Sequence, residues 1–533
     1  MADDTPNILL LFTDQQRYDT IAAAGFDHMI TPNLDRLVRE GCLFRRAYTA
    51  NPICIPARHN LITGLPARFH GYSSNMGHPL DHRLPVLPRI LSDAGWETRA
   101  VGKMHFRPVR RHNGFDRMEL MEEIPRWREH DDYAMYLKEV GLGQIVNIHG
   151  VRNLLYLAPQ RSLIPEEHHG SAWVGDRSVE FLRANAGRRP FFLWSSWIHP
   201  HPPWDVPDSL ADLYAGRDIP EPLVSETPTH PGRRGGWSVA DIPPGREDYR
   251  IRRARELYYA AITLVDKNIG RILDALEDIG ELDNTLVIFT SDHGEMLGDH
   301  RSFLKGAPYD SSSRIPMVMR FPERLECGSV REELVDLNDI LPTVLDVAGL
   351  EYPGEHALPG ASVFGGEKDR SRQYIENGRR AGRWVSLLDE RYKYSYYFGG
   401  GREELFDLQA DPDETVNLLH AWGEEPRVAE ARGRLRAELV EYEREWGLPG
   451  HVVDGDFAVF EEPERNPGRN GQFQRFPEQI ADPAERAAMN DFGEEVLAAV
   501  REEDVRLHEM DLETWLENGA PQELVERIRR EGL

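Results

Sequence analysis

Cysteine, lysine and long apolar runs are all scarce in this sequence, and each shortage narrows what the protein can be. Three cysteines in 533 residues cannot form a disulfide framework. No run approaches the ~20 apolar residues that cross a bilayer, so we expect no membrane partner. The formal net charge of −27 argues against a nucleic-acid partner, because neutralising phosphates requires a basic surface.

Lysine is much rarer than arginine. Of the 63 basic residues, six are lysine and 57 are arginine. This bias makes each lysine a candidate for a specific role, because Lys offers a compact point charge where Arg offers a planar fork. The six are Lys103, Lys138, Lys267, Lys305, Lys368 and Lys393.

The N-terminus contains no processing signal that we can identify. It begins Met1-Ala-Asp-Asp-Thr-Pro6 and has no basic segment, long apolar run or small-residue cleavage site. Together with the low cysteine content, this predicts a cytoplasmic protein. We expect Cys42 and Cys327 to be ordinary small residues in or near a core.

Short apolar runs alternate with amphipathic helical patterns over most of the chain. Such runs are typical of strands buried on both faces of a parallel sheet. We therefore predict an α/β fold with a large doubly wound, mostly parallel sheet, whose ligands bind beyond the carboxyl ends of the strands. The predicted strands are 7–13, 97–101, 190–197, 284–291 and 315–321, and helices are predicted at 31–40 and about 251–279.

The pattern predicts three parts of the chain. The α/β domain is expected over 1–365, and a smaller α+β subdomain over 366–450 contains an antiparallel sheet and a helix near 425–445. Residues 451–533 form an acidic extension with 21 acidic and 9 basic side chains and a helical pattern from about 482 to 530. We favour an oligomerisation arm over a solvated helical arm, because its apolar residues need partners, and so expect a homo-oligomer.

Polar residues suited to metal binding follow two of the predicted strands. Asp14 and Gln15 end the first strand, and Asp292 and His293 end the strand at 284–291. Carboxylate, amide and imidazole groups can hold a divalent cation. The alternative for Asp14 is a helix cap.

Cys54 lies in a different setting from the other two cysteines. It begins a predicted helix in Asn51-Pro-Ile-Cys54-Ile-Pro-Ala-Arg58. A thiol at a helix N-terminus near an arginine is a candidate reactive group, and the alternative is a buried structural cysteine.

The Cys-X-Pro-X-Arg spacing at Cys54 resembles the maturation signature of the type I sulfatases, in which this cysteine is oxidised to formylglycine. Residues 31–37 and 61–65 are also similar to the family, and the resemblance covers roughly residues 5–450. It implies the alkaline-phosphatase-like fold. The Asp-His pair, with Gln15, is similar to the branch that includes iduronate-sulfatase-like and phosphonate monoester hydrolase-like members.

The resemblance also implies a cofactor set. One divalent cation, Ca²⁺ in preference to Mn²⁺ or Mg²⁺, would be held by Asp14, Gln15, Asp292, His293 and an oxygen of hydrated formylglycine at Cys54. A formylglycine-generating enzyme is then the expected maturation partner. The hydrate would attack sulfur with one hydroxyl and use the second to expel sulfate.

Other site residues follow from the same resemblance. Lys103, in a Gly-Lys-X-His segment, Lys305 and His201 would contact the sulfate, and His105 would take a proton from the second hydroxyl. Arg58 would hold the geminal hydroxyl. His199 is the alternative to His201 and Asn75 is a further candidate for substrate binding; the alternatives are loop histidines fixed by prolines and a turn asparagine.

The predicted function is therefore sulfatase activity on a sulfated carbohydrate or on an aryl or alkyl sulfate. The nearest alternative is a phosphonate monoester hydrolase or phosphodiesterase of the same superfamily. The intact Gly-Lys-Met-His segment favours sulfate, since that branch has uncharged hydroxyl residues there. A non-catalytic anion-binding relative is a third alternative, and the sequence does not select the organic part of the substrate.

Overall fold

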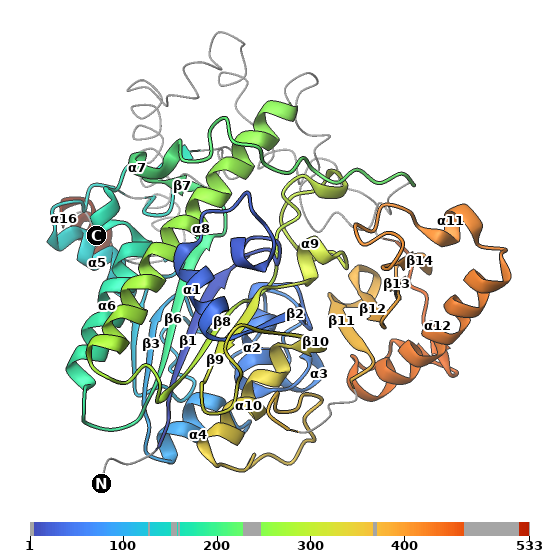
Figure 1. Cartoon of the computed structure of the whole chain (residues 1–533), viewed down its shortest axis with the longest axis horizontal. Helices are drawn as coiled ribbons and strands as arrows, with labels where there is room; N and C mark the ends of the chain where they lie inside the picture. Colours follow the sequence, from blue (N-terminus) through green and yellow to red (C-terminus); the bar gives the residue numbers. More distant parts are fainter. Residues whose placement is uncertain are drawn as a thin grey trace.

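A computed structural model describes residues 5–125, 128–145, 147–150, 157, 160–227, 247–365, 370–462 and 522–531. An eight-stranded sheet lies at its centre (Figure 1). Neighbouring strands in this sheet run parallel, except that β9 is antiparallel to both β2 and β8. The fold class predicted from the sequence is confirmed. In order across the sheet, the strands are β10 (Ser329–Asp336), β2 (Cys42–Tyr48), β9 (Met317–Arg320), β8 (Thr285–Ser291), β1 (Asn7–Asp14), β6 (Phe191–Pro200), β3 (Glu97–Gly102) and β4 (Arg117–Leu120).

Strand β1 connects two hydrophobic cores on opposite faces of the sheet. Because successive side chains of a strand point to opposite faces, Ile8, Leu10 and Phe12 enter one core and Leu9 and Leu11 the other. Burial on both faces explains why this segment is apolar throughout. The first core includes α2 (Cys54–Thr63), α4 (Leu87–Asp93) and α10 (Ile340–Ala348), and the second includes α1 (Pro32–Glu40), α5 (Asp132–Glu139), α6 (Gly170–Asn185) and α8 (Glu247–Asp278).

The predicted strands at 7–13, 97–101, 190–197 and 284–291 correspond to β1, β3, β6 and β8, and the segment 315–321 contains β9. Strands β2, β4 and β10 were not predicted. The helix predicted at 31–40 is α1, and the one predicted at about 251–279 lies within α8.

The two cysteines predicted to be ordinary core residues differ in burial. Cys42 is buried on β2, as expected. The prediction for Cys327 is wrong, because its side chain is exposed in the turn that precedes β10.

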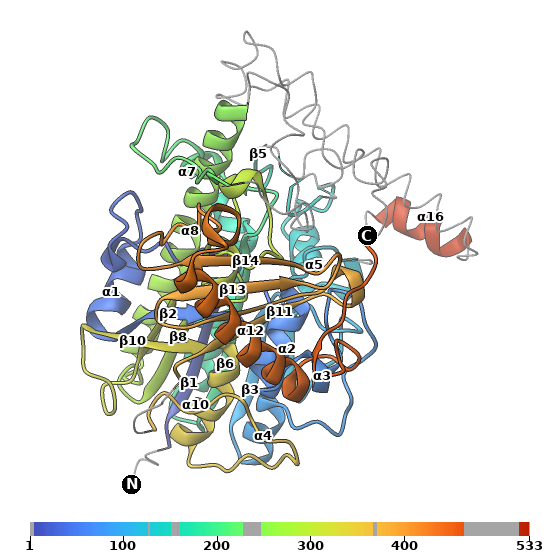
Figure 2. The same cartoon turned by 90° about the vertical axis from the view of Figure 1, so that its right-hand side faces the viewer.

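The smaller subdomain is a four-stranded antiparallel sheet covered by α12 (Pro426–Trp446), which lies in front of it in Figure 2. The sheet joins the large domain through the N–H of Glu376, which donates to the carbonyl of Ala50 at 2.9 Å, and through the indole N–H of Trp384, which donates to the carbonyl of Gly306 at 2.8 Å. The antiparallel sheet was predicted for this part of the chain, and α12 corresponds to the helix predicted near 425–445. The strands are β11 (Gln373–Asn377), β12 (Trp384–Leu388), β13 (Tyr392–Tyr397) and β14 (Arg402–Asp407).

The acidic extension begins with the hairpin of β15 (Val452–Val453) and β16 (Asp456–Phe457). Residues 463–521, which hold most of the predicted helical pattern, lie outside the described residues. Helix α16 (Gln522–Glu531) overlaps the end of that pattern. The oligomerisation arm stays a prediction. Within the described ranges, no helix combines the length and apolarity needed to cross a membrane.

The remaining elements are short connectors around the two sheets. They are η1 (Ala22–Ala24), α3 (Ala67–His70), η2 (Arg128–His130), β5 (Gln160–Arg161), η3 (Glu166–His168), β7 (Asp205–Val206), α7 (Asp208–Ala211), η6 (Asp299–Arg301), α9 (Asp310–Ser313), η7 (Leu337–Asp339), η8 (Arg380–Gly382) and α11 (Leu418–Trp422).

Candidate active site

Four adjacent parallel strands end at the same edge of the large sheet. They are β8, β1, β6 and β3, so the residues that follow them are neighbours although they are far apart in sequence. Asp292, Asp14, His201 and Lys103 lie at these four ends. This is the edge at which an open α/β sheet binds its ligands.

Asp14, Cys54, Asp292 and His293 form one buried group. Their ligand atoms all lie within 4.8 Å of one another, and each side chain is completely buried. Sγ of Cys54 is 3.3 Å from Nε2 of His293 and 3.9 Å from Oδ1 of Asp14. Two carboxylates, an imidazole and the position of Cys54 therefore converge on one point.

Cys54 is the first residue of α2, as the sequence predicted. Behind it, Oδ1 of Asn75 accepts a hydrogen bond from the backbone N–H of Ile55 at 3.0 Å. Asn75 thus satisfies one of the amide groups that the first turn of a helix leaves without a partner. Its contact is with the helix that carries Cys54, and the half-buried side chain fixes the start of that helix.

Arg58 connects the group to its surroundings. Its guanidinium donates to Oδ2 of Asp14 at 2.9 Å, to Oδ2 of Asp292 at 3.3 Å, to the carbonyl of Lys103 at 2.5 Å and to Oγ of Ser196 at 3.0 Å. The side chain is completely buried. It therefore joins α2 to the ends of β1, β8, β3 and β6.

The electrostatics of the group suit a divalent cation. Burial and the nearby carboxylate of Asp14 raise the pKa of Asp292 to about 7. Burial also opposes ionisation of Asp14, but Lys103, His201 and Arg58 lower the pKa of that carboxyl well below its ordinary value. Two carboxylates this close repel each other, and a bound cation would relieve the repulsion.

Gln15 lies beside the group of Asp14, Cys54, Asp292 and His293, but its side chain points away from these residues, toward Glu295 and Lys305. Its backbone N–H donates to Oδ1 of Asp292 at 2.9 Å, in a left-handed conformation with φ of 68°. Its side-chain amide bonds to Glu295 through the nitrogen and to Lys305 through the oxygen. Lys305 is thereby placed at the rim of the site. Glu295 lies within the Asp-His-Gly-Glu segment, which is the signal that could have found it.

Lys103 is completely buried between two carboxylates. Its Nζ lies 2.7 Å from Oδ2 of Asp14 and 2.6 Å from Oε2 of Glu123. Burial lowers the pKa of the Lys103 ammonium, but Asp14 and Glu123 outweigh it and raise the pKa above its ordinary value. His201 shares one of these partners, since its Nε2 is 3.5 Å from Oε1 of Glu123.

Glu123 and its neighbour Glu122 were not predicted. Oε1 of Glu122 accepts the backbone N–H groups of Met104 and His105 at 3.0 and 2.9 Å. The two glutamates follow β4 in an ordinary acidic stretch, and we find no sequence signal that would have singled them out.

The other predicted histidines take different positions. His105 lies beside Lys103 and Glu123, and its Nδ1 has no hydrogen-bond partner within the part of the chain that the structure describes. His199 contacts Ser171 through Nδ1 and Asp205 through Nε2, each at 3.2 Å, and stacks on His169. Of the two candidates His199 and His201, His201 is the one that adjoins Lys103 and Asp14.

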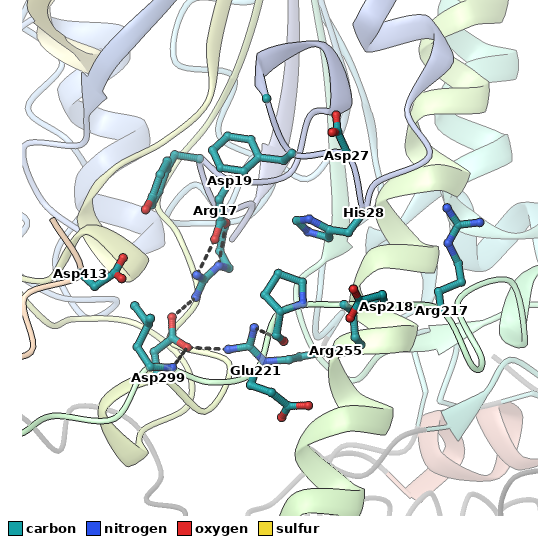
Figure 3. Close-up of a pocket in the computed structure, with 16 residues that line it drawn as sticks. Arg17, Asp19, Asp27, His28, Arg217, Asp218, Glu221, Arg255, Asp299 and Asp413 are labelled. Atoms are coloured by element: carbon teal, nitrogen blue, oxygen red, sulfur yellow. Dashed lines mark hydrogen bonds and ion pairs between the residues drawn. The ribbon is translucent and has the colours of Figure 1, made fainter.

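Arg17, which follows Gln15 and Gln16, leads to a separate cavity of about 950 Å³ (Figure 3). Its guanidinium pairs with Asp19 and Asp299, each at 2.7 Å, and Arg255 pairs with Asp299 at 2.5 Å. The guanidinium groups of both buried arginines are therefore paired with carboxylates. Further acidic residues line it: Asp27, Asp218, Glu221 and Asp413.

Comparison with protein families gives two matches. The sulfatase family model matches residues 6–350, and the model described as the C-terminal part of N-sulphoglucosamine sulphohydrolase matches residues 298–445. An arylsulfatase of Clostridium perfringens is 32% identical over 459 residues, which cover 81% of this chain and 94% of that protein.

Solved structures share the fold. The phosphonate monoester hydrolase of Silicibacter pomeroyi has a TM-score of 0.68 at 24% identity, covering 83% of this chain and 96% of its own. A protein solved in complex with its substrate D-glucosamine-2-N,6-O-disulfate has a TM-score of 0.68 at 21% identity, with 83% and 98% covered.

Proposed function

The chain belongs to the sulfatase family, and we propose that it hydrolyses sulfate monoesters at the buried group of Asp14, Cys54, Asp292 and His293. One observation supports this most strongly. These four side chains, with their ligand atoms within 4.8 Å of one another, adjoin the cations Lys103 and Arg58. A metal-binding group next to buried cations is what a reacting sulfate anion requires.

The proposed cofactors are one divalent cation and formylglycine at position 54. Asp14, Asp292 and His293 would hold the cation, with Ca²⁺ preferred for its oxygen-rich donor set and Gln15 as an additional ligand if its amide turns inward. The bound cation would polarise the sulfate oxygens. Formylglycine at position 54 would supply an aldehyde hydrate, with one hydroxyl to attack sulfur and one to expel sulfate.

The remaining residues neutralise charge and move protons. Lys103, Lys305 and His201 would stabilise the nonbridging oxygens of the sulfate, and a histidine or lysine of the site would protonate the leaving oxygen. Arg58 keeps α2 and the ends of the strands in register through four hydrogen bonds. His105, with its Nδ1 free of hydrogen bonds within the described ranges, would accept a proton from position 54.

The proposed substrates are sulfated saccharides or aryl and alkyl sulfates. The relative from Clostridium perfringens is named an arylsulfatase, and a protein of the same fold was solved with a sulfated glucosamine. The second candidate is phosphonate monoester hydrolysis, which the shared fold of the Silicibacter pomeroyi enzyme favours. We also propose a formylglycine-generating enzyme as a partner, a cytoplasmic location, and self-association through residues 451–533.

Two measurements test the proposal. Peptide mass spectrometry of the purified protein should show the Cys54 peptide about 18 Da lighter than its thiol form, the change expected on oxidation to the aldehyde. The matured protein should then hydrolyse 4-nitrophenyl sulfate faster than 4-nitrophenyl phenylphosphonate. A faster phosphonate reaction would select the second candidate, and hydrolysis of neither ester by matured protein would refute both.

A further inference from the structure

Glu295 is a carboxylate that the proposed mechanism does not use, and its side chain is completely buried. Its Oε1 accepts the backbone N–H of Leu297 at 2.8 Å and that of Leu304 at 2.5 Å. Its Oε2 accepts the side-chain N–H of Gln15, the residue that follows β1. Glu295 therefore joins the end of β1 to two points of the loop in which it lies.

This loop, residues 295–305, carries Lys305 to the rim of the site, and its backbone is strained. Four of its non-glycine residues have positive φ, between 47° and 67°: Leu297, His300, Arg301 and Leu304. Residues with a side chain rarely adopt this conformation, and they keep it only where surrounding contacts fix it. By accepting two of the backbone N–H groups, Glu295 closes the loop directly before Lys305.

The side-chain amide of Gln15 can face only one way between its two partners. A carboxylate only accepts hydrogen bonds, and an ammonium group only donates them. The amide nitrogen therefore points to Glu295 and the amide oxygen to Lys305. The backbone of Gln15 is fixed as well, since its N–H donates to Oδ1 of Asp292 at 2.9 Å and its carbonyl accepts the hydroxyl of Tyr258 at 2.7 Å. Glu295 thus decides that the amide presents an acceptor to Lys305.

Lys305 needs such an acceptor, because its placement is not fixed by deep burial. The side chain is half-buried, and a lysine side chain is flexible unless a partner holds its ammonium group. Lys305 is among the charges that act on Asp14, His201 and His293. Its ammonium group therefore lies within electrostatic range of the group at which the sulfate is proposed to react.

We infer that Glu295 is a positioning residue, which holds the ammonium group of Lys305 at the site through the amide of Gln15 and the closed loop. The inference rests on the proposed function, in which Lys305 stabilises the nonbridging oxygens of the sulfate. These oxygens are negatively charged before as well as during the reaction, so Lys305 stabilises both bound substrate and transition state. Loss of Glu295 should therefore weaken binding more than it slows the chemical step.

The test is the isosteric variant Glu295→Gln, assayed with 4-nitrophenyl sulfate. The amide oxygen at position 295 can still accept the two backbone N–H groups, but its nitrogen now faces Gln15 and turns that amide over. The nitrogen of Gln15 would then face Lys305 and displace it. We expect KM to rise about tenfold, the factor that one contact with a charged group is worth, and kcat to fall less than about threefold. The dissociation constant of inorganic sulfate, measured by titration calorimetry, should rise by a similar factor.

A second background shows whether the effect passes through Lys305. Lys305→Met removes the ammonium group that Glu295 is inferred to position. In this background, Glu295→Gln should change KM and the dissociation constant of sulfate less than about twofold. A purely structural role of Glu295 would instead weaken binding equally in both backgrounds. Because calorimetry needs no turnover, the comparison holds even where Lys305→Met is too slow to assay.

Exchange of the two side chains provides a rescue. In the double variant Gln15→Glu with Glu295→Gln, the amide nitrogen at position 295 donates to the carboxylate at position 15, whose second oxygen faces Lys305. The hydrogen bonds and the total charge are kept. KM and the dissociation constant of sulfate should therefore lie closer to the wild-type values than those of Glu295→Gln alone.

Glu443→Gln is the matched control. Glu443 is a buried carboxylate of the smaller subdomain, and it accepts a hydrogen bond from Arg383 at 2.8 Å. This variant should unfold at a lower temperature than wild type but keep its KM. If Glu295→Gln does not fold, Glu295→Asp takes its place. Its carboxylate is one carbon shorter and withdraws from Gln15, so KM should rise by a smaller factor that Lys305→Met again removes.

Unchanged KM and sulfate binding in Glu295→Gln, or an equal loss of binding in the Lys305→Met background, would overturn the inference. Wild-type protein with matured Cys54 that hydrolyses neither 4-nitrophenyl sulfate nor 4-nitrophenyl phenylphosphonate would instead overturn the proposed function. The two failures are therefore distinguishable.

Discussion

Nη2 of Arg58 lies 2.9 Å from Oδ2 of Asp14, and both side chains are completely buried. The same guanidinium reaches Asp292, so one cation contacts both carboxylates of the group around Cys54. Removing one partner of a buried ion pair leaves an uncompensated charge, which costs more than the pair itself contributes.

Arg58→Ala should therefore lower the free energy of unfolding by about 3–5 kcal/mol and abolish activity. Denaturant unfolding of the purified variant measures the first effect. Arg110→Ala is the matched control, because Arg110 pairs with Asp132 at 2.9 Å but both side chains are more than a third exposed. That variant should lose less than about 1 kcal/mol. Similar losses for the two variants would contradict the account.

Cys54→Ser should abolish steady-state turnover of an aryl sulfate. A serine hydroxyl can attack sulfur, but it has no second hydroxyl with which to expel the sulfate. Sulfated protein should therefore accumulate, with a mass about 80 Da higher at position 54. Cys327→Ser changes an exposed thiol and should keep full activity. Full turnover by Cys54→Ser would show that the proposed chemistry at this position is wrong.

Metal removal should lower both activity and thermal stability. A ligand that binds only the folded state stabilises it by ~2.7 kcal/mol at a hundred times its dissociation constant. Chelation should thus lower Tm by several degrees, and added Ca²⁺ should restore both Tm and activity. In Asp292→Asn, the shift of Tm on chelation should shrink. An unchanged shift in that variant would place the cation elsewhere.

Asn75→Ala tests whether Asn75 acts through α2. Loss of a helix-capping side chain costs ~1 kcal/mol, so we expect a loss of that size in unfolding experiments. Asn75→Asp keeps the acceptor for the N–H of Ile55 and should recover the stability. A large rise of KM in Asn75→Ala with unchanged stability would indicate direct substrate contact instead.

The buried side chain of His59 should make the stability of the protein depend on pH. It is buried in α2, with Nδ1 donating to the carbonyl of Ile55 at 2.7 Å and no partner for Nε2 among the described residues. Burial lowers its pKa to about 4. The pKa of His59 in the folded protein is below its pKa in the unfolded chain, so the unfolded chain binds the proton first as the pH falls. The stabilising effect of the neutral ring on the folded state is therefore complete above pH ~6.5 and is lost as the pH falls toward 4. The total loss in the free energy of unfolding is roughly 3 kcal/mol.

Denaturant unfolding between pH 4 and pH 7 measures this slope. His59→Asn, which has no titrating ring, should show a flatter dependence, even if it is less stable at every pH. Part of the slope should remain, because burial also lowers the pKa of His70, and that of His169 to about 3. An unchanged slope would mean that His59 is not buried neutral.

The parts of the fold that the sequence predicted are those that carry a local pattern. β1, β6 and β8 are apolar along their whole length because both faces are covered. β2 and β10 contain charged residues, and some of their positions are partly exposed. Both features are common in strands at or near the edge of a sheet. Their charges interrupted the apolar runs on which the prediction depended. The antiparallel direction of β9 depends on its partners and leaves no trace in its own residues.

The site residues also fall into those that a local sequence pattern predicts and those that it does not. Asp14, Lys103, Asp292 and His293 were named because they sit in short motifs at strand ends. Glu123 was not predicted as a site residue. Its contact with Lys103 forms only when the segment that follows β4 packs against the loop after β3. A partner supplied by tertiary packing has no periodicity or spacing to reveal it.

The position of β1 between β6 and β8 also sets an order of events during synthesis. β1 is made first, yet β8 emerges about 270 residues later, which at ~5–20 residues per second takes roughly 15–55 s. Until then the central strand lacks one neighbour, and Asp292 and His293 cannot close over Cys54. If Cys54 is modified as proposed, the modifying enzyme would have a limited interval in which to act on the nascent chain, and slower translation before β8 would lengthen that interval.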